Sequence, residues 1–289
     1  MEARRDRPYT GIRTLARTGS LYVILVGCGI LFLAPVLWMI SASLQDQQGV
    51  FATPYEWIPE TPRWDNYSTV TTVFPFWRYV GNTLIVTISV TVGTLLSCTL
   101  VAYGFARVRF PGRNLLFALC LSTMMLPGQV TMIPLYVMFA RVGWVDTFLP
   151  LIVPSLFGTP FYIFLLRQFF LTIPREYDEA ALLDGAGHFR IYWSIVLPLA
   201  RPAIATVALF SFVGAWNDFF GPLIYINSPE NATLTLGLNM LKAQIAGTGV
   251  VEWQVLMAGS LLVMLPNVIV FLLAQKHFVK GLAIGGLRG

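Results

Sequence analysis

The stretch Glu179-Ala180-Ala181-Leu182-Leu183-Asp184-Gly185 is followed, after nine further residues, by Ile195-Val196-Leu197-Pro198. Both runs lie in a polar region between long apolar segments. Alanine and leucine favour a helix, and a glycine directly after them can take the positive φ that ends one. The first run therefore predicts a short helix that ends at Gly185.

The neighbouring residues extend this prediction. Pro174 suits the first helical turn, where its missing N–H costs nothing. The acidic residues Glu176, Asp178 and Glu179 then lie near the positive end of the helix dipole, in a helix of about ten residues. A second helical stretch, roughly 189–197, is expected to end before Pro198.

The composition indicates a membrane protein. Of the 289 residues, 56% are hydrophobic and only 11% are charged, whereas a soluble domain carries about 25% charged residues. So few charges cannot cover a water-facing surface. The formal net charge of +5 does not indicate nucleic-acid binding, because the basic residues follow a membrane topology.

Six segments reach the length of about 20 mostly apolar residues that a membrane helix needs. They are residues 21–43, 79–104, 114–139, 148–170, 202–226 and 254–275. With the N-terminus inside, all of the 19 Lys and Arg residues fall on the inner side except Arg63, Arg78, Arg141 and Lys242. Cytoplasmic loops carry an excess of Lys and Arg, so both termini are predicted to be cytoplasmic.

The predicted fold class is all-α, a polytopic membrane protein with six transmembrane helices. The expected parts are a cytoplasmic leader (1–20), a first transmembrane helix (21–43), an extracytoplasmic loop (44–78), a five-helix core (79–275) with the polar loop at 174–198, and a cytoplasmic tail (276–289). The apolar run after the leader is long and ends without a small-residue cleavage site, so it is interpreted as a retained anchor.

The sequence shows no catalytic or metal-binding pattern. Cys28, Cys98 and Cys120 lie inside apolar segments, and His188 and His277 are isolated. The lysines do not occur in the phosphate-binding loop motif of ATPases, so the chain is not expected to bind ATP through that motif. No catalytic residue, metal site or bound cofactor is expected in this chain.

The spacing E-A-A-x3-G-x9-I-x-L-P resembles the coupling-loop signature of the permease subunits of bacterial ABC importers. The resemblance covers roughly residues 78–289 and implies the type-1 importer permease fold. It also implies that this loop seats in a cleft of an ATPase subunit. The residues assigned to this coupling are Glu179, Ala180, Ala181, Leu183, Asp184, Gly185, Ile195, Leu197 and Pro198. The alternative is an interfacial amphipathic helix that merely connects two spans.

The C-terminal residues carry a narrower resemblance. The run from Gln275 to Gly289 is similar to the tail of the second permease in transporters of the maltose type, which reaches between two ATPase subunits. The implied ATPase contacts are Gln275, Lys280, Gly281, Gly285 and Gly286. Considered alone, this short basic tail is a frayed terminus.

The resemblance further implies a subunit of the bacterial cell (inner) membrane that is not itself an enzyme. Its expected partners are a second permease, two copies of an ABC ATPase, an extracytoplasmic solute-binding protein and the lipid bilayer. ATP and Mg²⁺ would be bound by the ATPase. The subunit would form half of the path for a sugar, oligosaccharide or polyol derivative.

Polar residues inside the spans are candidates for that path. In permeases of this kind, Trp-Asn followed by an acid lies near the translocation path. The candidates are Gln129, Trp216, Asn217, Asp218 and Asn267. The alternative for these residues is hydrogen bonding between helices, without contact with solute.

Proteins with other membrane functions would show different residues in their spans. An ion-coupled secondary transporter would show an intramembrane ionisable pair or inverted repeats, and neither is visible. A membrane enzyme would need a nucleophile and a base at one depth. Within the ABC class, a permease for peptides or amino acids is the nearest alternative.

Overall fold

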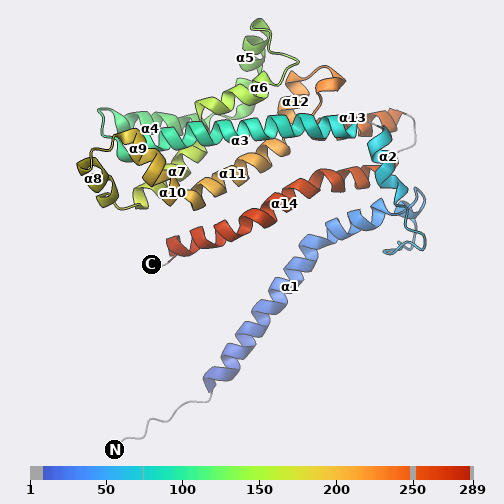
Figure 1. The fold of residues 1–289 in the computed structure, drawn as a ribbon. Helices are drawn as coiled ribbons and strands as arrows, with labels where there is room; N and C mark the ends of the chain where they lie inside the picture. Colours follow the sequence, from blue (N-terminus) through green and yellow to red (C-terminus); the bar gives the residue numbers. More distant parts are fainter. Residues whose placement is uncertain (1–8, 74, 248–251, 287–289) are drawn as a thin grey trace, which may run out of the picture. The chain divides into compact units, whose positions relative to one another are not determined.

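The computed structural model describes residues 9–73, 75–247 and 252–286, and every regular element in these ranges is helical. The chain forms two compact units, residues 1–70 with 250–261 and residues 71–249 with 262–289. The α-helices (Figure 1) are α1 (Tyr9–Ser43), α2 (Asp65–Val73), α3 (Phe76–Arg107), α4 (Arg113–Ser122), α5 (Gly128–Arg141), α6 (Leu149–Ile152), α7 (Pro160–Thr172), α8 (Glu176–Leu183), α9 (His188–Ile191), α10 (Leu197–Leu199), α11 (Arg201–Trp216), α12 (Phe220–Tyr225), α13 (Leu234–Gly247) and α14 (Trp253–Gly286).

Four helical segments within the described residues are long and apolar enough to cross a membrane. They are Thr18–Ser43, Phe76–Arg107, Leu149–Thr172 and Trp253–Gln275. Two bent pairs bring the number to six if each pair counts as one span: Arg113–Met125 with Gly128–Arg141 at 96°, and His188–Leu199 with Arg201–Trp216 at 80°. The all-helical prediction is thus confirmed for the described residues, and the six spans and cytoplasmic termini stay predictions.

The expected spans 114–139 and 202–226 are not single straight helices, and the span 148–170 divides into α6, a 3₁₀ segment (Val153–Phe157) and α7. In the first, Pro127 separates α4 and its 3₁₀ extension from α5, because proline lacks the N–H that would continue the helix. In the second, α11 ends at Trp216 and α12 begins at Phe220. Between them Asp218 accepts a hydrogen bond from the Gly221 N–H (3.1 Å), a local bond that competes with a continuous helix.

The polar region also differs in detail from its prediction. The first helix, α8, begins at Glu176, so Pro174 precedes it rather than occupying its first turn. The second stretch combines α9, a π-helix (Tyr192–Val196) and α10. The expectation that this stretch ends before Pro198 is wrong, because Pro198 lies in the first turn of α10, where no N–H is needed.

In the first unit, the chain after α1 folds back onto the end of that helix. Ser41 Oγ donates to the Trp57 carbonyl (2.7 Å), and Asn66 Nδ2 donates to the carbonyls of Ser43 and Gln45 (2.9 Å each). The Ser43 and Tyr67 hydroxyls lie 2.8 Å apart. The loop therefore has defined structure, in keeping with its aromatic content.

In the second unit, α3 is the helix around which the others assemble. Both α7 and α11 pack along it (Figure 1). The 3₁₀ segment Val153–Phe157 approaches it closely at Gly93, where a Cβ would collide with the Ser155 hydroxyl. Ser97 Oγ donates to the Ser155 carbonyl there (2.8 Å).

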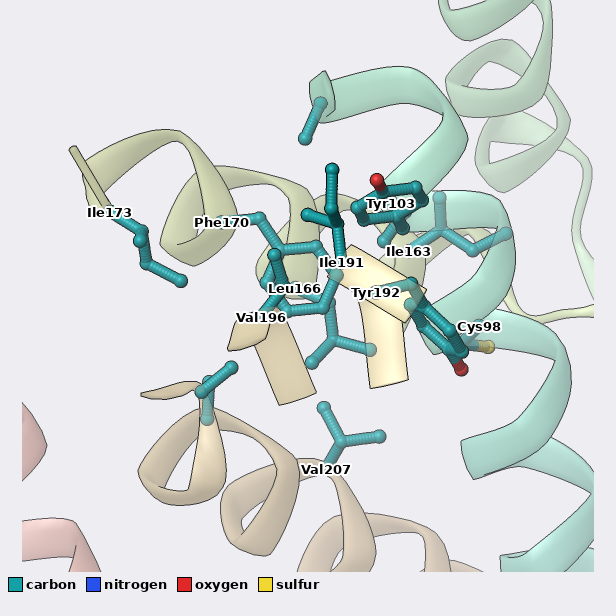
Figure 2. Packing of buried hydrophobic residues seen from close by; sticks show 14 of the residues in the cluster. Cys98, Tyr103, Ile163, Leu166, Phe170, Ile173, Ile191, Tyr192, Val196 and Val207 are labelled. Atoms are coloured by element: carbon teal, nitrogen blue, oxygen red, sulfur yellow. The ribbon is translucent and has the colours of Figure 1, made fainter. Parts of the chain in front are cut away.

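One apolar core joins α3, α7, α8 and the region from α9 to α11. Figure 2 shows Phe170, Leu166, Ile191 and Val196 converging in it. Phe170, Leu166 and Val196 are fully buried. The core therefore connects the predicted coupling region directly to two of the candidate membrane spans.

A polar clip closes the opposite end of this unit. Asp146, at a positive φ of 65°, accepts hydrogen bonds from the N–H groups of Asn227 (3.0 Å) and Ser228 (2.8 Å) and from the Ser228 hydroxyl. Asn231 Nδ2 donates to the Asp146 carbonyl (2.8 Å). The clip joins the loop before α6 to the segment after α12.

The clip predicts a pH-dependent stability. Hydrogen bonds from the Ser228 hydroxyl, and then from the backbone of Ser228 and Asn227, hold the pKa of Asp146 below its usual value. The clip therefore stabilises the fold above the unfolded pKa, near pH 4, and this contribution is lost as the pH falls. Between about pH 5 and pH 3, the thermal unfolding midpoint of the detergent-purified protein should fall more for wild type than for Asp146→Ala. Equal falls in both proteins would contradict the prediction.

Candidate functional site

Helix α8 is short and starts with acidic residues. Its first turn contains Glu176, Asp178 and Glu179, and the N–H groups of Asp178 and Glu179 donate to the Arg175 carbonyl (2.9 and 3.0 Å). Carboxylates are favourable at this end because the helix dipole is positive there. The local sequence thus explains why a helix begins here.

Gly185 ends α8 in the way that its sequence predicts. Its φ is +79°, its N–H donates to the Leu182 carbonyl (3.0 Å), and the Ala186 N–H donates to the Ala181 carbonyl (2.9 Å). This pair of bonds is the Schellman arrangement, which needs a left-handed residue at the position of Gly185. The turn sends the chain back toward the core through the half-buried Ala186.

The inner face of α8 is anchored by a buried ion pair. Asp178 Oδ2 lies 3.2 Å from Arg107 Nη1, and the Arg107 side chain is only 3% exposed. Arg107 Nη2 also donates to the carbonyls of Phe170 and Ile173 (2.7 Å each). One guanidinium therefore joins the end of α3, the end of α7 and the first turn of α8.

The sequence interpretation missed this role of Arg107. It counted Arg107 only as one of the basic residues that set the membrane topology. The three acceptors come from residues 63 to 71 positions further along the chain, and no local pattern brings them together. The only available signal was an arginine at the end of an apolar span.

The segment after α8 is fastened to α3 as well. The hydroxyls of Thr99 and Tyr192 lie 2.8 Å apart, and the Tyr103 hydroxyl donates to the His188 carbonyl (3.1 Å). Of the other predicted coupling residues, Ile195 and Leu197 are half-buried against the core and Pro198 is exposed.

The outer face of the same region is exposed. Ala181 is buried, whereas Glu179, Ala180 and Asp184 are exposed and Leu183 is 90% exposed. Phe189 and Trp193, from the following segment, are 72% and 58% exposed. An anchored inner face and an apolar outer face with a carboxylate are the features of a docking surface.

The candidate path residues do not form one cluster. Trp216 is buried and its Nε1 donates to the Val263 carbonyl (3.0 Å), whereas Asn267 Nδ2 donates to Asn217 Oδ1 (3.0 Å). Asp218 lines a separate cavity of about 510 Å³ with Thr94 and Ser211, and Gln129 is exposed at the start of α5. The structure thus brings Asn217 and Asn267 together.

The predicted tail continues α14 as far as Gly286. Gln275 is exposed, and its Nε2 donates to the Leu272 carbonyl (3.0 Å). The backbone of Lys280, Gly281, Gly285 and Gly286 is helical, but their side-chain contacts lie outside what the structure describes, as do residues 287–289. The proposed ATPase contacts of the tail remain predictions.

Comparison with known proteins gives consistent matches. Residues 93–284 match the family model described as "Binding-protein-dependent transport system inner membrane component". The sn-glycerol-3-phosphate transport system permease protein UgpE of Shigella flexneri is 33% identical, over 90% of this chain and 93% of that one. The arabinooligosaccharides transport system permease protein AraQ of Halalkalibacterium halodurans is 31% identical, over 94% and 99%.

The fold has a match among solved structures. It is a chain from the crystal structure of a bacterial ABC transporter involved in the import of the acidic polysaccharide alginate, with a TM-score of 0.80 and 24% identity. The match covers 96% of this chain and 100% of that one. The importer-permease fold expected from the coupling-loop spacing is thereby confirmed.

Gly185→Ala should destabilise the protein by about 1 kcal/mol, because alanine is strained at positive φ. A Cβ at Gly185 would meet no atom within 4 Å, so the cost comes from the backbone alone. Gly187→Ala is the matched control, since Gly187 has a φ of −76° and equally open space. Denaturant unfolding in detergent measures both, and equal stabilities would contradict the prediction.

Arg107→Ala should cost about 3 kcal/mol or more, because it leaves the partly buried Asp178 carboxylate without its cation and removes a donor from two carbonyls. Asp178→Ala should cost less, because the guanidinium keeps both carbonyl partners. The exposed Arg190 supplies the control, Arg190→Ala, which should change stability by less than about 0.5 kcal/mol. The same unfolding assay gives the order, and an Asp178→Ala cost as large as that of Arg107→Ala would disprove it.

Proposed function

Because the chain belongs to the family of binding-protein-dependent transport system inner membrane components, we propose that it is one of two permease subunits of an ATP-driven importer. The solute is a sugar, an oligosaccharide or a polyol derivative. Support comes from the relatives, whose names specify sn-glycerol-3-phosphate and arabinooligosaccharides. Both solutes are hydroxyl-rich, and one is a polyol phosphate.

The observation that carries the proposal is the division of α8 into two faces. Asp178 and Ala181 attach the helix to α3 and to the core, while Glu179 and Leu183 project from it. In the proposed complex the exposed face seats in a cleft of the ATPase subunit. Glu179 then pairs with a basic residue of that subunit, and Leu183 fills apolar space.

The same arrangement supports a mechanism of coupling. ATP and Mg²⁺ bind to a pair of ATPase subunits, whose closure pulls residues 174–187. Because Arg107 ties α8 to the ends of α3 and α7, this pull is transmitted to both candidate spans. The spans rock from inward-open to outward-open, and a solute-binding protein delivers solute near the midplane between the two permeases.

The test uses α8 variants that spare the fold. Glu179→Ala and Leu183→Ala should each lower recovery of the ATPase on co-purification in mild detergent by about tenfold, because each removes an exposed docking contact. Unfolding stability should change by less than about 0.5 kcal/mol, since neither side chain is buried. Mass spectrometry of the co-purified proteins gives the recovery, and Arg190→Ala serves as the control for an exposed change on the following segment.

The outcome also separates the proposal from its rivals. Recovery of an ATPase, a second permease and a solute-binding protein with wild type, and loss of the ATPase with the α8 variants, supports it. A chain that purifies alone and transports in liposomes on an ion gradient without ATP is a secondary transporter instead.

A further inference from the structure

Two cavities meet at the end of the second unit where α3 finishes. One, of about 530 Å³, is lined by Arg109, Arg113 and Arg175. The other, of about 360 Å³, shares Arg109 and Arg175 and extends beneath α8 to Arg107. Figure 1 shows the end of α3 and the helices α4 and α8 at this same end. The arginines therefore come from two separate segments, the connection from α3 into the start of α4 and the residue before α8, and converge on one concave surface.

The charge of the larger cavity is not balanced by the residues that line it. No carboxylate lines the 530 Å³ cavity, whereas Asp178 and Glu179 line the 360 Å³ cavity together with Arg109 and Arg175. Among the described residues the ion pairs are Arg63–Asp65 and Arg107–Asp178, so Arg109, Arg113 and Arg175 have no acidic partner there. Arg113 donates only a long hydrogen bond to the Val108 carbonyl (3.4 Å). Three neighbouring positive charges repel one another, and an anion between them removes that cost.

The depth of the surface matches a membrane interface. Arg109 follows the candidate span Phe76–Arg107 by two residues, and Arg175 follows the span Leu149–Thr172 by three. Arg113 starts α4, the first part of a bent candidate span. All three arginines therefore lie next to the ends of helices that are apolar enough to span a membrane, where Lys and Arg can meet lipid headgroups.

The surroundings suit a ligand with both a phosphate and acyl chains. The ten-residue helix α4 begins at this surface after Gly112, which has no side chain to cap its free N–H groups, and its dipole adds positive potential. Beside the arginines, Leu115 and Leu116 are 65% and 50% exposed, and Phe110 is 37% exposed. A free phosphate gains nothing from such an apolar rim, whereas a phospholipid places its acyl chains against it.

We propose that Arg109, Arg113 and Arg175 bind the phosphate group of an anionic phospholipid in the leaflet at this end of the helices. The site is independent of the transport function, because it needs only the purified chain and lipid. Arg113, the first residue of α4, and Arg175, the residue before α8, both contact the headgroup. A bound lipid therefore also stabilises the position of the loop that carries α8.

The test is native mass spectrometry of the full-length chain, released from mixed micelles of phosphatidylglycerol and phosphatidylcholine. Wild type should retain phosphatidylglycerol in preference. The double variant Arg109→Gln with Arg175→Gln should retain roughly tenfold less, because each arginine near the surface strengthens anionic-lipid binding. Arg190→Gln removes one positive charge, half the loss of the double variant, from an exposed residue on α9 and should retain the wild-type amount.

Each outcome of this experiment either supports or overturns the proposed phospholipid site. Equal retention by all three proteins, or an equal loss in Arg190→Gln, would overturn the site and leave only a general attraction between basic loops and lipid. Displacement of the lipid by millimolar inorganic phosphate, but not by chloride of the same ionic strength, would assign the site to a soluble phosphate and overturn the lipid assignment. A wild-type unfolding midpoint in the double variant excludes misfolding as the cause of its loss.

Discussion

The hydrogen bonds and the ion pair of the Arg107 guanidinium hold together the end of the second unit that carries α8. Removing an arginine from water is costly, and the cost is recovered only when the donors find acceptors of good geometry. Here the acceptors are a carboxylate and two carbonyls from the end of α7. Those carbonyls lie at the C-terminal end of a helix, where the dipole also favours a cation. The Phe170 carbonyl also accepts from the Ile173 N–H (3.3 Å), so the guanidinium supplies a second donor there. The buried charge is therefore placed where the end of α7 already presents acceptors.

In the proposed coupling, this constraint explains how a helix of eight residues could transmit force. A helix this short has little stability of its own, because its nucleation cost is spread over few hydrogen bonds. Attached through Asp178 and Ala181, α8 instead behaves as part of the body formed by α3 and α7. A displacement of α8 must then either carry those helices with it or break a buried ion pair. Since the second course costs several kcal/mol, the first is favoured.

Much of the site was predictable from local sequence, and the rest was not. The acidic first turn, the length of α8 and the positive φ at Gly185 follow from residue preferences that act over a few positions. The bend at Pro127 follows from the proline itself, but apolar length alone predicted a straight span there. The π-helix from Tyr192 has no signal in residue preferences, so a simple helix end was predicted instead. The burial of Trp216 and its hydrogen bond to the Val263 carbonyl depend on tertiary packing. The sequence Trp-Asn-Asp is the same whether its side chains line a solute path or pack between helices, so it could not predict which.

The arginines near the ends of the candidate spans show why a count of Lys and Arg predicts membrane orientation but not the role of each residue. The residues predicted to face the cytoplasm include side chains in three physical situations. Arg107 is buried and paired, and Arg167 donates to the Phe105 carbonyl (3.2 Å) and lies 4.1 Å over the Phe117 ring. Arg109 and Arg175 are exposed and form no ion pair among the described residues, although Asp178 and Glu179 line one of the two cavities beside them. All four count equally in a prediction of membrane orientation, since that effect needs only a charge near the end of a span. Only Arg107 and Arg167 are held by contacts within the fold, so the same charge count describes side chains with different physical roles.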